Sequence, residues 1–437
     1  MGTPANSTRA GGGDSPAPPA RHKSFAALRY RDFRLLWAGQ FFSLTGSQMQ
    51  LVAINWHVYL LMRPRGEPAA AAALGLVGLV RVLPIVVCSL VGGVVADAAD
   101  RKRLMLITQT VMLLSAAALA AFTASGLEQV WPVYALTALT SAAVAFDNPA
   151  RQALLPALVP ARDFPNAVSL GFVSFQVAFV SGPVLGGVVL ARYGPAAVYA
   201  FNAFSFLAVI FAVLLMRASG KGVAGEAARV SLESLKEGLS FVWRTPIMVQ
   251  TMTLDFVATF FASATALLPI FARDVLKVGE RGYGLLAAAS ATGAVLTGLL
   301  LARRAGWRRP GLAVLVSVAV YGAATVGFGL SRTYWLSLLL LAVSGAADTV
   351  STVVRQTIRQ LITPDRLRGR MTSVNMIFFM GGPQLGELEA GLVAAAAGAP
   401  FSVVLGGVCC LAAVAFTSAR ARELLRYRFA HEQEWNG

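Results

Sequence analysis

Twelve long apolar runs follow one another along the chain, separated by short polar segments. They cover residues 33–62, 69–96, 104–125, 130–146, 167–190, 195–216, 247–272, 283–301, 312–330, 334–353, 371–396 and 401–419. About 20 apolar residues in a helix cross a bilayer core, so each run can span it, the shortest only marginally. Twelve such runs exceed what a soluble chain of 437 residues can bury. The pattern therefore predicts an all-α membrane protein, and 56% hydrophobic against 13% charged residues agrees with it.

The polar segments are strongly basic on alternate sides only. With the first segment and Arg34, at the start of the first run, placed in the cytoplasm, the inside holds 29 of the 37 Lys and Arg residues, the outside segments hold 7, and one, Arg81, falls deep within a run. Basic loops are retained in the cytoplasm, so we expect both termini inside and the protein in the inner (cytoplasmic) membrane. The net charge of +16 thus reports topology, and no motif supports a nucleic-acid partner.

Several other classes of protein lack a supporting motif. No apolar signal-peptide core precedes the first run, so residues 1–32 are expected to form a cytoplasmic segment that is disordered over residues 1–24 and contains a short helix before the first run. Cys88, Cys409 and Cys410 lie inside runs and have no metal-binding spacing. No phosphate-binding glycine loop is present, so ATP hydrolysis is not expected. We therefore expect no enzymatic activity, no cofactor and no metal.

An internal duplication divides the chain into two halves. An Arg-Gln pair with a proline eight residues later occurs at residues 151–152 and again at 355–356, an offset of 204. A glycine with an arginine ten residues later recurs at an offset of 205. The agreement predicts two parallel six-helix repeats. Their bounds are 33–216 and 247–419, with a cytoplasmic linker at 217–246 that carries an amphipathic helix and a cytoplasmic tail at 420–437.

Two motifs resemble signatures of the major facilitator superfamily of transporters. Residues 93–103 read Gly-Val-Val-Ala-Asp-Ala-Ala-Asp-Arg-Lys-Arg, similar to its loop signature of a glycine, an acid four residues later and a basic cluster, with departures at Ala98 and Asp100. Residues 182–187 read Gly-Pro-Val-Leu-Gly-Gly, which resembles the signature of its proton-coupled exporters. Residues 147–156, 366–370 and 385–387 are similar to the branch that contains the enterobactin exporter and Tap-like multidrug efflux pumps. The resemblance implies twelve helices in two six-helix halves.

The loop motif implies a cytoplasmic gate. A carboxylate at Asp97, where the second run leaves the membrane, can accept hydrogen bonds from a helix N-terminus and from a nearby arginine. The gate residues that the resemblance implies are Gly93, Asp97, Arg101, Lys102, Arg103, Arg151 and Arg370. The alternative is that these charges only set the topology.

The glycine motif in the fifth run also has two interpretations. Gly182 and Gly186 form a small face that admits another helix, and Pro183 removes a backbone hydrogen bond and permits a bend. Together with Gly187 they resemble an antiporter-specific element. Close helix packing alone would explain the same residues.

Charged side chains inside the runs are candidates for proton coupling, because each costs roughly 2.5 to 3.5 kcal/mol on insertion scales unless it has a partner or a wet cavity. They are Arg81, Asp255, Asp348, Glu387 and Glu389. Arg81 and Glu387 lie at similar depths, ~18 and ~14 Å below the outer ends of their runs. The resemblance places these runs face to face, so we predict an ion pair between Arg81 and Glu387.

Polar residues of the first and seventh runs are candidates for the substrate cavity. They are Gln48, Gln50, Asn55, Asp255 and Thr259, although several could instead bond neighbouring helices. His57 is expected close to the outer surface and solvated.

The function favoured by these patterns is a proton-coupled exporter of a small amphipathic molecule, such as a drug, metabolite or siderophore, that works by alternating access as a monomer. The expected partners are that substrate, protons and the lipid bilayer. An importer or facilitator of the same fold, or a transport-inactive membrane receptor or scaffold, remain the alternatives.

Overall fold

The computed structural model describes residues 25–420 except 127–128, 219–239, 263–264, 304–306, 308 and 365–366. For residues 90–98 and 368–380 it describes the backbone alone. The described chain is helical throughout and contains no strand. The predicted linker helix lies mostly within 219–239 and so falls outside the described residues.

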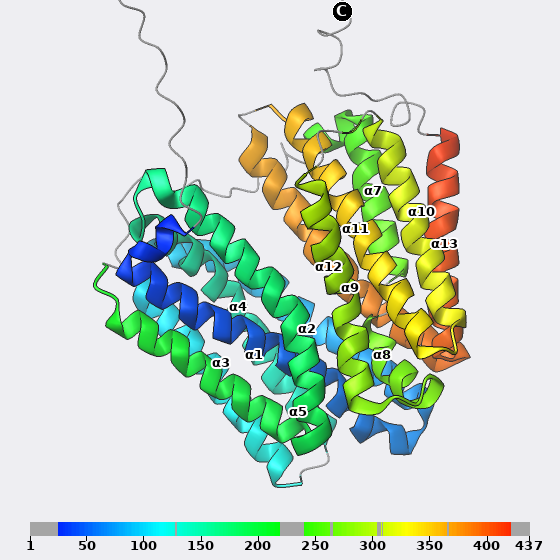
Figure 1. The fold of residues 1–437 in the computed structure, drawn as a ribbon, viewed down its shortest axis with the longest axis horizontal. Helices are drawn as coiled ribbons and strands as arrows, with labels where there is room; N and C mark the ends of the chain where they lie inside the picture. The colour runs from blue at the N-terminus through cyan, green and yellow to red at the C-terminus, as the bar shows by residue number, and fades with distance from the viewer. Residues whose placement is uncertain are drawn as a thin grey trace, which may run out of the picture.

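The helices form two bundles, called here the N half and the C half (Figure 1). The N half contains η1 (Ala26–Arg29), α1 (Arg31–Met62), η2 (Arg63–Arg65), α2 (Glu67–Ala98), α3 (Arg101–Ala124), α4 (Val130–Leu154), η3 (Leu155–Ala157), η4 (Ala161–Asp163) and α5 (Phe164–Leu215). The C half contains α7 (Pro246–Phe261), η5 (Thr265–Leu267), α8 (Leu268–Ile270), η6 (Phe271–Val275), α9 (Gly279–Leu301), α10 (Pro310–Leu330), α11 (Tyr334–Ile362), α12 (Arg368–Ala397) and α13 (Ala399–Arg420).

Nine helical stretches in the described part of the chain are long and apolar enough to cross a membrane. One of them, Ala161–Leu215, has 55 residues and would measure about 80 Å if straight, more than twice the thickness of a bilayer core. It consists of two helices joined at Gly194, whose φ of 74° lies in the left-handed region that glycine adopts without strain. The turn at Gly194 therefore sends the chain back across the membrane, as the separate runs at 167–190 and 195–216 predicted.

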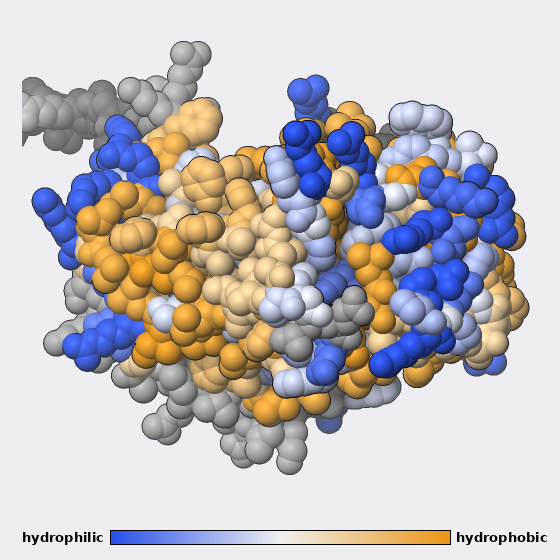
Figure 2. Space-filling view, turned by 90° about the horizontal axis from the view of Figure 1, so that it is seen from below, coloured by the Kyte–Doolittle hydropathy of each residue, from blue (hydrophilic) through white to orange (hydrophobic). Residues whose placement is uncertain are grey.

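The lateral surface suits a lipid environment. Large apolar side chains are exposed on many helices, among them Phe172, Phe204, Phe211 and Trp335. Seen from the end at which the two halves meet, apolar residues cover much of the surface and hydrophilic residues gather in patches (Figure 2). In water such surface would be unfavourable, whereas lipid tails solvate it well.

The halves meet along two helix pairs, α2 with α12 and α5 with α9. Each pair crosses at glycines. A Cβ added at Gly75 would lie 2.9 Å from Cα of Gly391, and one added at Gly187 would lie 2.8 Å from Cα of Gly284. Backbones can approach this closely only where side chains are absent.

Polar and aromatic contacts close the same end of the molecule. The Tyr59 hydroxyl donates to Asp274 at 3.0 Å, and Nε of Arg63 lies 3.2 Å from Oδ2 of the same carboxylate. Trp56 stacks on Tyr283 of the C half with ring centroids 5.3 Å apart. At the opposite end, where α1 begins and α13 ends, the two bundles diverge (Figure 1). The structure is therefore closed at one end and open at the other.

Candidate transport site

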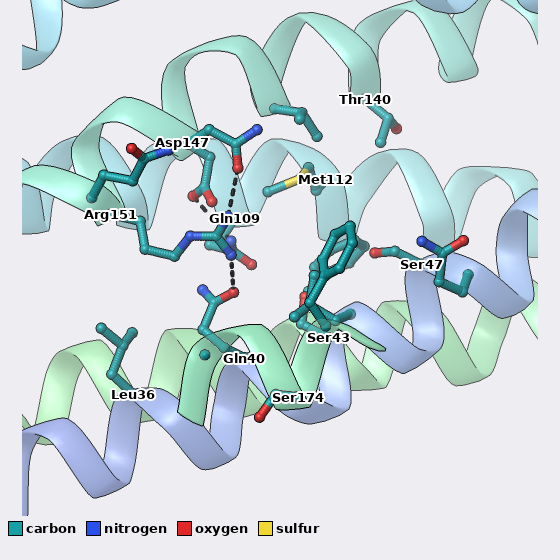
Figure 3. Close-up of a pocket in the computed structure, with 18 of the residues that line it drawn as sticks. Leu36, Gln40, Ser43, Ser47, Gln109, Met112, Thr140, Asp147, Arg151 and Ser174 are labelled. Atoms are coloured by element: carbon teal, nitrogen blue, oxygen red, sulfur yellow. Dashed lines mark hydrogen bonds between the residues drawn. The ribbon is translucent and has the colours of Figure 1, made fainter. Parts of the chain in front are cut away.

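A cavity of about 690 Å³, called here the main cavity, lies in the N half between α1, α2, α3, α4 and α5. Its wall combines polar side chains with aromatic ones (Figure 3). The polar lining residues include Gln40, Ser43, Ser47, Gln48, Gln50, Gln109, Thr140, Asp147, Asn148 and Arg151, and the aromatic ones include Trp37, Phe175, Phe179 and Phe206. A volume and lining of this kind are typical of a small-molecule site.

Two charged residues of α4 reach the cavity from one helix face, because Asp147 and Arg151 are four residues apart. Asp147 is 4% exposed, and its Oδ1 accepts hydrogen bonds from Thr108 at 2.9 Å and from Nε2 of Gln109 at 3.0 Å. Arg151 donates to Oε1 of Gln40, which comes from α1 (Figure 3). It also donates to Oδ1 of Asn148 at 2.6 Å. Arg151, which was predicted for the cytoplasmic gate, therefore lies in the cavity wall.

The inner wall of the cavity is a bonded polar layer. Nδ2 of Asn202 donates to Oε1 of Gln50 at 2.7 Å, and Ser205 donates to Oδ1 of Asn202 at 2.9 Å. Gln48 lies on the same helix as Gln50, and both line the cavity. These amides join α1 to the second part of α5, so they hold the cavity wall in shape as well as lining it.

The predicted partners Arg81 and Glu387 come together across the halves. Nη1 of Arg81 lies 4.0 Å from Oε2 of Glu387. Glu387 also accepts a hydrogen bond from Thr265 at 3.3 Å. Gly78 of α2 makes room for the acid, since a Cβ there would lie 2.9 Å from Cβ of Glu387. Because Arg81 also lines the N-half cavity, the pair joins the interface between the halves to the cavity wall.

Asp255 has a partner that the sequence did not predict. Its carboxylate forms an ion pair with Arg355 of α11, whose side chain is only 9% exposed. Arg355 also donates to the carbonyl oxygen of Ser351 at 3.2 Å and to Thr352 at 3.1 Å. The space beside this pair is only about 20 Å³, too small for an organic substrate.

Asp348 and Thr259 face a separate C-half cavity of about 180 Å³, whose other lining residues include Thr265, Tyr321 and Thr325. Of the residues predicted for the substrate cavity, Gln48 and Gln50 line the main cavity, whereas Asp255 and Thr259 lie in the C half away from it. Glu389 is partly exposed and has no hydrogen bond or ion pair among the described residues.

Two polar residues of α1 lie elsewhere than expected. Asn55 is buried and hydrogen-bonds the hydroxyl of Tyr283 across the closed end, so it does not line the cavity. His57 is 7% exposed, and its Nδ1 lies 3.1 Å from the hydroxyl of Tyr199. The expectation that His57 is solvated was therefore wrong. The helix places it toward α5 rather than toward the outer surface.

The basic cluster of the loop motif caps helices within the N half. Asp100 is the N-cap of α3 and accepts from the backbone N–H of Lys102 at 2.9 Å and of Arg103 at 3.2 Å. Arg101 donates to the carbonyl oxygen of Ala153 at 2.8 Å, near the end of α4. Nζ of Lys102 donates to the carbonyl oxygen of Met216 at 2.7 Å, at the end of α5. Cations at helix C-termini are stabilising, so these contacts have a structural role in this state. The side chains of Gly93, Asp97 and Arg370 lie outside the described residues, and the gate stays a prediction.

The glycine motif of α5 packs on both sides of the helix. Gly182 faces Gln48 and Gly186 faces Met49, both on α1, while Gly187 faces α9 of the C half. A Cβ at Gly186 would lie 3.2 Å from Cα of Met49. The motif therefore permits close packing within the N half and between the halves.

The structure reveals a second copy of this motif in α12, which was not predicted. Residues 382–387 read Gly-Pro-Gln-Leu-Gly-Glu, and Gly382 and Gly386 face Thr259 and Phe260 of α7. The helix pair α12 and α7 thus repeats the pair α5 and α1. At the place of Gly187 the second copy has Glu387, the acid that pairs with Arg81.

Three charged residues of the described chain were missed as site residues: Asp147, Asp274 and Arg355. Each lies just beyond the end of a run that was delimited by hydropathy, although its segment is still helical. A signal was present for Asp147 and Arg355, since the Arg-Gln repeat places both near matching ends of α4 and α11. No comparable signal pointed to Asp274.

The chain is similar to transporters throughout its length. It is 27% identical over 393 residues to the multidrug efflux pump Tap of Mycolicibacterium fortuitum, covering 87% of this chain and 93% of the pump. It is 27% identical over 326 residues to the enterobactin exporter EntS of Shigella boydii, covering 73% of this chain and 78% of the exporter.

Solved structures show the same fold. A bacterial homologue of the human lysosomal transporter Spinster has a TM-score of 0.71 at 16% identity, covering 92% of this chain and 99% of the homologue. The nucleoside transporter NupG has a TM-score of 0.68 at 15% identity, covering 91% of this chain and 100% of NupG. With the nine apolar helices, these matches make the protein a multi-pass inner-membrane transporter rather than an enzyme. The family model described as transmembrane secretion effector matches residues 22–434, so the chain belongs to this family of the major facilitator superfamily.

Proposed function

We propose that the protein is a proton-coupled exporter that moves a small amphipathic molecule out of the cytoplasm by alternating access. The observation that carries this proposal is the ion pair of Arg81 and Glu387, which joins the two halves at the wall of the main cavity. Protonation of Glu387 removes its negative charge and weakens its attraction to Arg81. A proton can thereby alter the contact between the halves beside a bound substrate.

The direction of transport follows from topology and from the relatives. If the twelve predicted runs all span and the basic loops lie inside, the open end of the structure faces the cytoplasm and the closed end faces outward. The cavity is then poised to take its substrate from the cytoplasm. The names of the two relatives, an efflux pump and an exporter, support the same direction.

Asp255 and Asp348 provide further acids in the C half. In the proposed cycle the C half (247–419) rocks against the N half (33–216) about the cavity, with the linker at 217–246 joining them. Asp348 shares its small cavity with Thr265, the residue that bonds Glu387. Protons can therefore be exchanged in the C half while the substrate occupies the N half.

The test uses purified protein in liposomes with an imposed pH gradient. Proton flux is measured while a panel of lipophilic cations, organic anions and siderophore-like compounds is added. In the wild type, we expect transport of one class of compound to drive protons across the membrane in the opposite direction. We expect Glu387→Gln to abolish this proton flux. Glu389→Gln is the matched control, because Glu389 lies on the same helix and has no partner among the described residues.

Three outcomes would contradict the proposal. Substrate movement down its own gradient without proton flux would favour a facilitator. Full proton release by Glu387→Gln would remove that residue from the coupling step. Proton movement in the same direction as the substrate would favour an importer.

A further inference from the structure

The wall of the N-half cavity presents more cationic than anionic surface. Arg81, Asp147 and Arg151 are its only lining residues with a formal charge, within the described chain. Arg151 is partly exposed, whereas Asp147 is 4% exposed. The Arg81 side chain is 25% exposed and that of its partner Glu387 only 12%. In both places the guanidinium is therefore the group that a ligand meets.

Within the described part of the chain, Arg151 has only neutral partners. A guanidinium has five N–H donors and no acceptor, and in Arg151 two of its nitrogens donate to the amide oxygens of Gln40 and Asn148. Among the described residues no carboxylate lies within ion-pair distance of it. A cation in a partly apolar cavity is stabilised by an anion far more than by amides alone.

The second repeat shows what such an arginine binds when the protein supplies the anion. Arg355 occupies the matching place in α11, and Asp255 from the first helix of its half is its ion-pair partner. At Arg151 the first helix supplies the neutral Gln40 instead. The space beside Arg355 is about 20 Å³, whereas the cavity at Arg151 is about 690 Å³. The N half thus has room for an external anion where the C half has its own.

The rest of the cavity wall suits an apolar or aromatic body. Trp37, Phe175, Phe179 and Phe206 line it, and the rings of Phe175 and Phe179 lie 4.3 Å apart. Aromatic side chains bury large apolar areas and stack on ligand rings. Because Arg151 lines the same cavity, a ligand with a charged end at Arg151 can place its rings among these residues.

We propose that this cavity binds amphipathic organic anions, with a carboxylate or sulfonate at the guanidinium of Arg151 and an aromatic body against the phenyl rings. The proposal rests on the proposed function in taking the cavity as the substrate site. It adds the chemical class of the substrate.

Three probes with the same pyrene ring system test the charge preference: pyrene-1-sulfonate, a pyrenylmethyl trimethylammonium salt and neutral pyrenemethanol. Binding to the protein in lipid nanodiscs is measured by energy transfer from tryptophan, with empty nanodiscs as the background. We expect the sulfonate to bind tightest. Its affinity should fall roughly ten- to a hundredfold in Arg151→Met, the range for a lost hydrogen bond to a charged group, and less in Arg151→Lys.

Two controls isolate the site. Arg309→Met makes the same change in net charge at an exposed position in the other half, and should leave sulfonate binding unchanged. Pyrenemethanol reports on an intact cavity, so its affinity should be the same in wild type and Arg151→Met. If Arg151→Met loses that too, Arg151→Lys decides, because it keeps the charge and replaces the planar guanidinium fork by a single ammonium: weaker sulfonate binding with unchanged pyrenemethanol binding supports the proposal, and unchanged binding of both contradicts it.

The proposal is overturned if the ammonium probe binds tighter than the sulfonate, or if sulfonate affinity is unchanged in Arg151→Met. Asp147→Asn further distinguishes anion binding at Arg151 from cation binding at Asp147. It should strengthen sulfonate binding by removing a nearby negative charge, whereas loss of ammonium binding in this variant would mark Asp147 as the anchor for cations. These measurements need no pH gradient, so binding of the anion without proton antiport would contradict the proposed function alone.

Discussion

Arg151 in the N half and Arg355 in the C half occupy matching places in the two repeats, yet their surroundings differ. Arg355 is buried and paired with Asp255, with almost no free space beside it. Arg151 is bonded to the neutral Gln40 and faces the main cavity. One repeat therefore neutralises its arginine within the protein, and the other leaves it open to a ligand.

The paired glycine motifs show the same division. Gly187 in α5 allows α9 to approach, while the corresponding Glu387 in α12 meets Arg81 of α2. Both positions lie where the halves meet. One helix pair between the halves thus has a neutral contact, and the other has an ionisable one.

The largest expected effect comes from unpairing the buried arginine. Asp255→Asn should destabilise the protein by about 3–5 kcal/mol, because the charge of Arg355, whose side chain is 9% exposed, is left without its partner. The double variant Asp255→Asn with Arg355→Met should recover much of this loss. Thermal unfolding of the purified protein in detergent measures both. Arg151→Met is the matched change in the other repeat and should cost far less, since it removes only bonds to neutral amides. Equal losses for Asp255→Asn and Arg151→Met would contradict the comparison.

A second effect tests whether the closed end is held by contact or by charge. A Cβ at Gly284 would lie 2.6 Å from the carbonyl oxygen of Pro183, so Gly284→Ala should force α5 and α9 apart. Overpacking of this kind costs about 1–3 kcal/mol. Here it would destabilise the conformation in which this end is closed. Gly298→Ala on the same helix is the control, because nothing lies within 4 Å of its added Cβ.

Thiol labelling of a cysteine placed between the halves reports the opening. We expect Gly284→Ala to increase labelling from the closed side and Gly298→Ala to leave it unchanged. If removal of Glu387 opens this end more than Gly284→Ala does, charge rather than contact holds it.

The prediction of an all-helical membrane protein is confirmed, because hydropathy detects segments that lie in lipid. Hydropathy placed the ends of some helices too early where those ends face protein or a cavity. The run at 130–146 stops before residues 147–154, half of which are polar and which continue α4 (Val130–Leu154) along the cavity. In the same way the run at 334–353 stops short of the end of α11 (Tyr334–Ile362). A helix that turns polar side chains toward a cavity loses its hydropathy signal without losing its hydrogen bonds.

The sequence predicted those contacts of the site that follow from the depth of each residue along its own helix. It did not predict the contacts that depend on how two helices pack. Equal depth and the resemblance together were enough to predict Arg81 opposite Glu387, because both side chains belong to long apolar helices with known directions. The pair of Asp255 and Arg355 depends on the rotation of two helices about their axes. Sequence spacing does not set that rotation, and Arg355 had been counted with the cytoplasmic residues. The network of Asp147 with Gln109 depends on tertiary packing in the same way.

A smaller effect is expected for the ion pair across the halves. Both side chains are partly exposed and lie 4.0 Å apart, so their coupling should be about 1 kcal/mol rather than that of a fully buried pair. A double-mutant cycle with Arg81→Met and Glu387→Gln, read by thermal unfolding at neutral pH, isolates this energy. The transport rate should fall clearly even though the loss of stability is small, because the pair joins two halves that move against each other in the proposed cycle. Strictly additive losses in both measurements would show that the two residues act independently.

The smallest effect is expected for Asp147→Asn, the same isosteric change as Asp255→Asn but in the other half. Oδ1 of Asp147 accepts from the Thr108 hydroxyl and from the Gln109 amide, and an asparagine oxygen can accept both bonds. No arginine depends on this carboxylate within ion-pair distance among the described residues, so the variant leaves no charge unpaired. We expect a loss below about 1 kcal/mol in thermal unfolding, against the several kcal/mol of Asp255→Asn. A loss as large as that of Asp255→Asn would mean that Asp147 neutralises Arg151 after all, and the two halves would then handle their arginines alike.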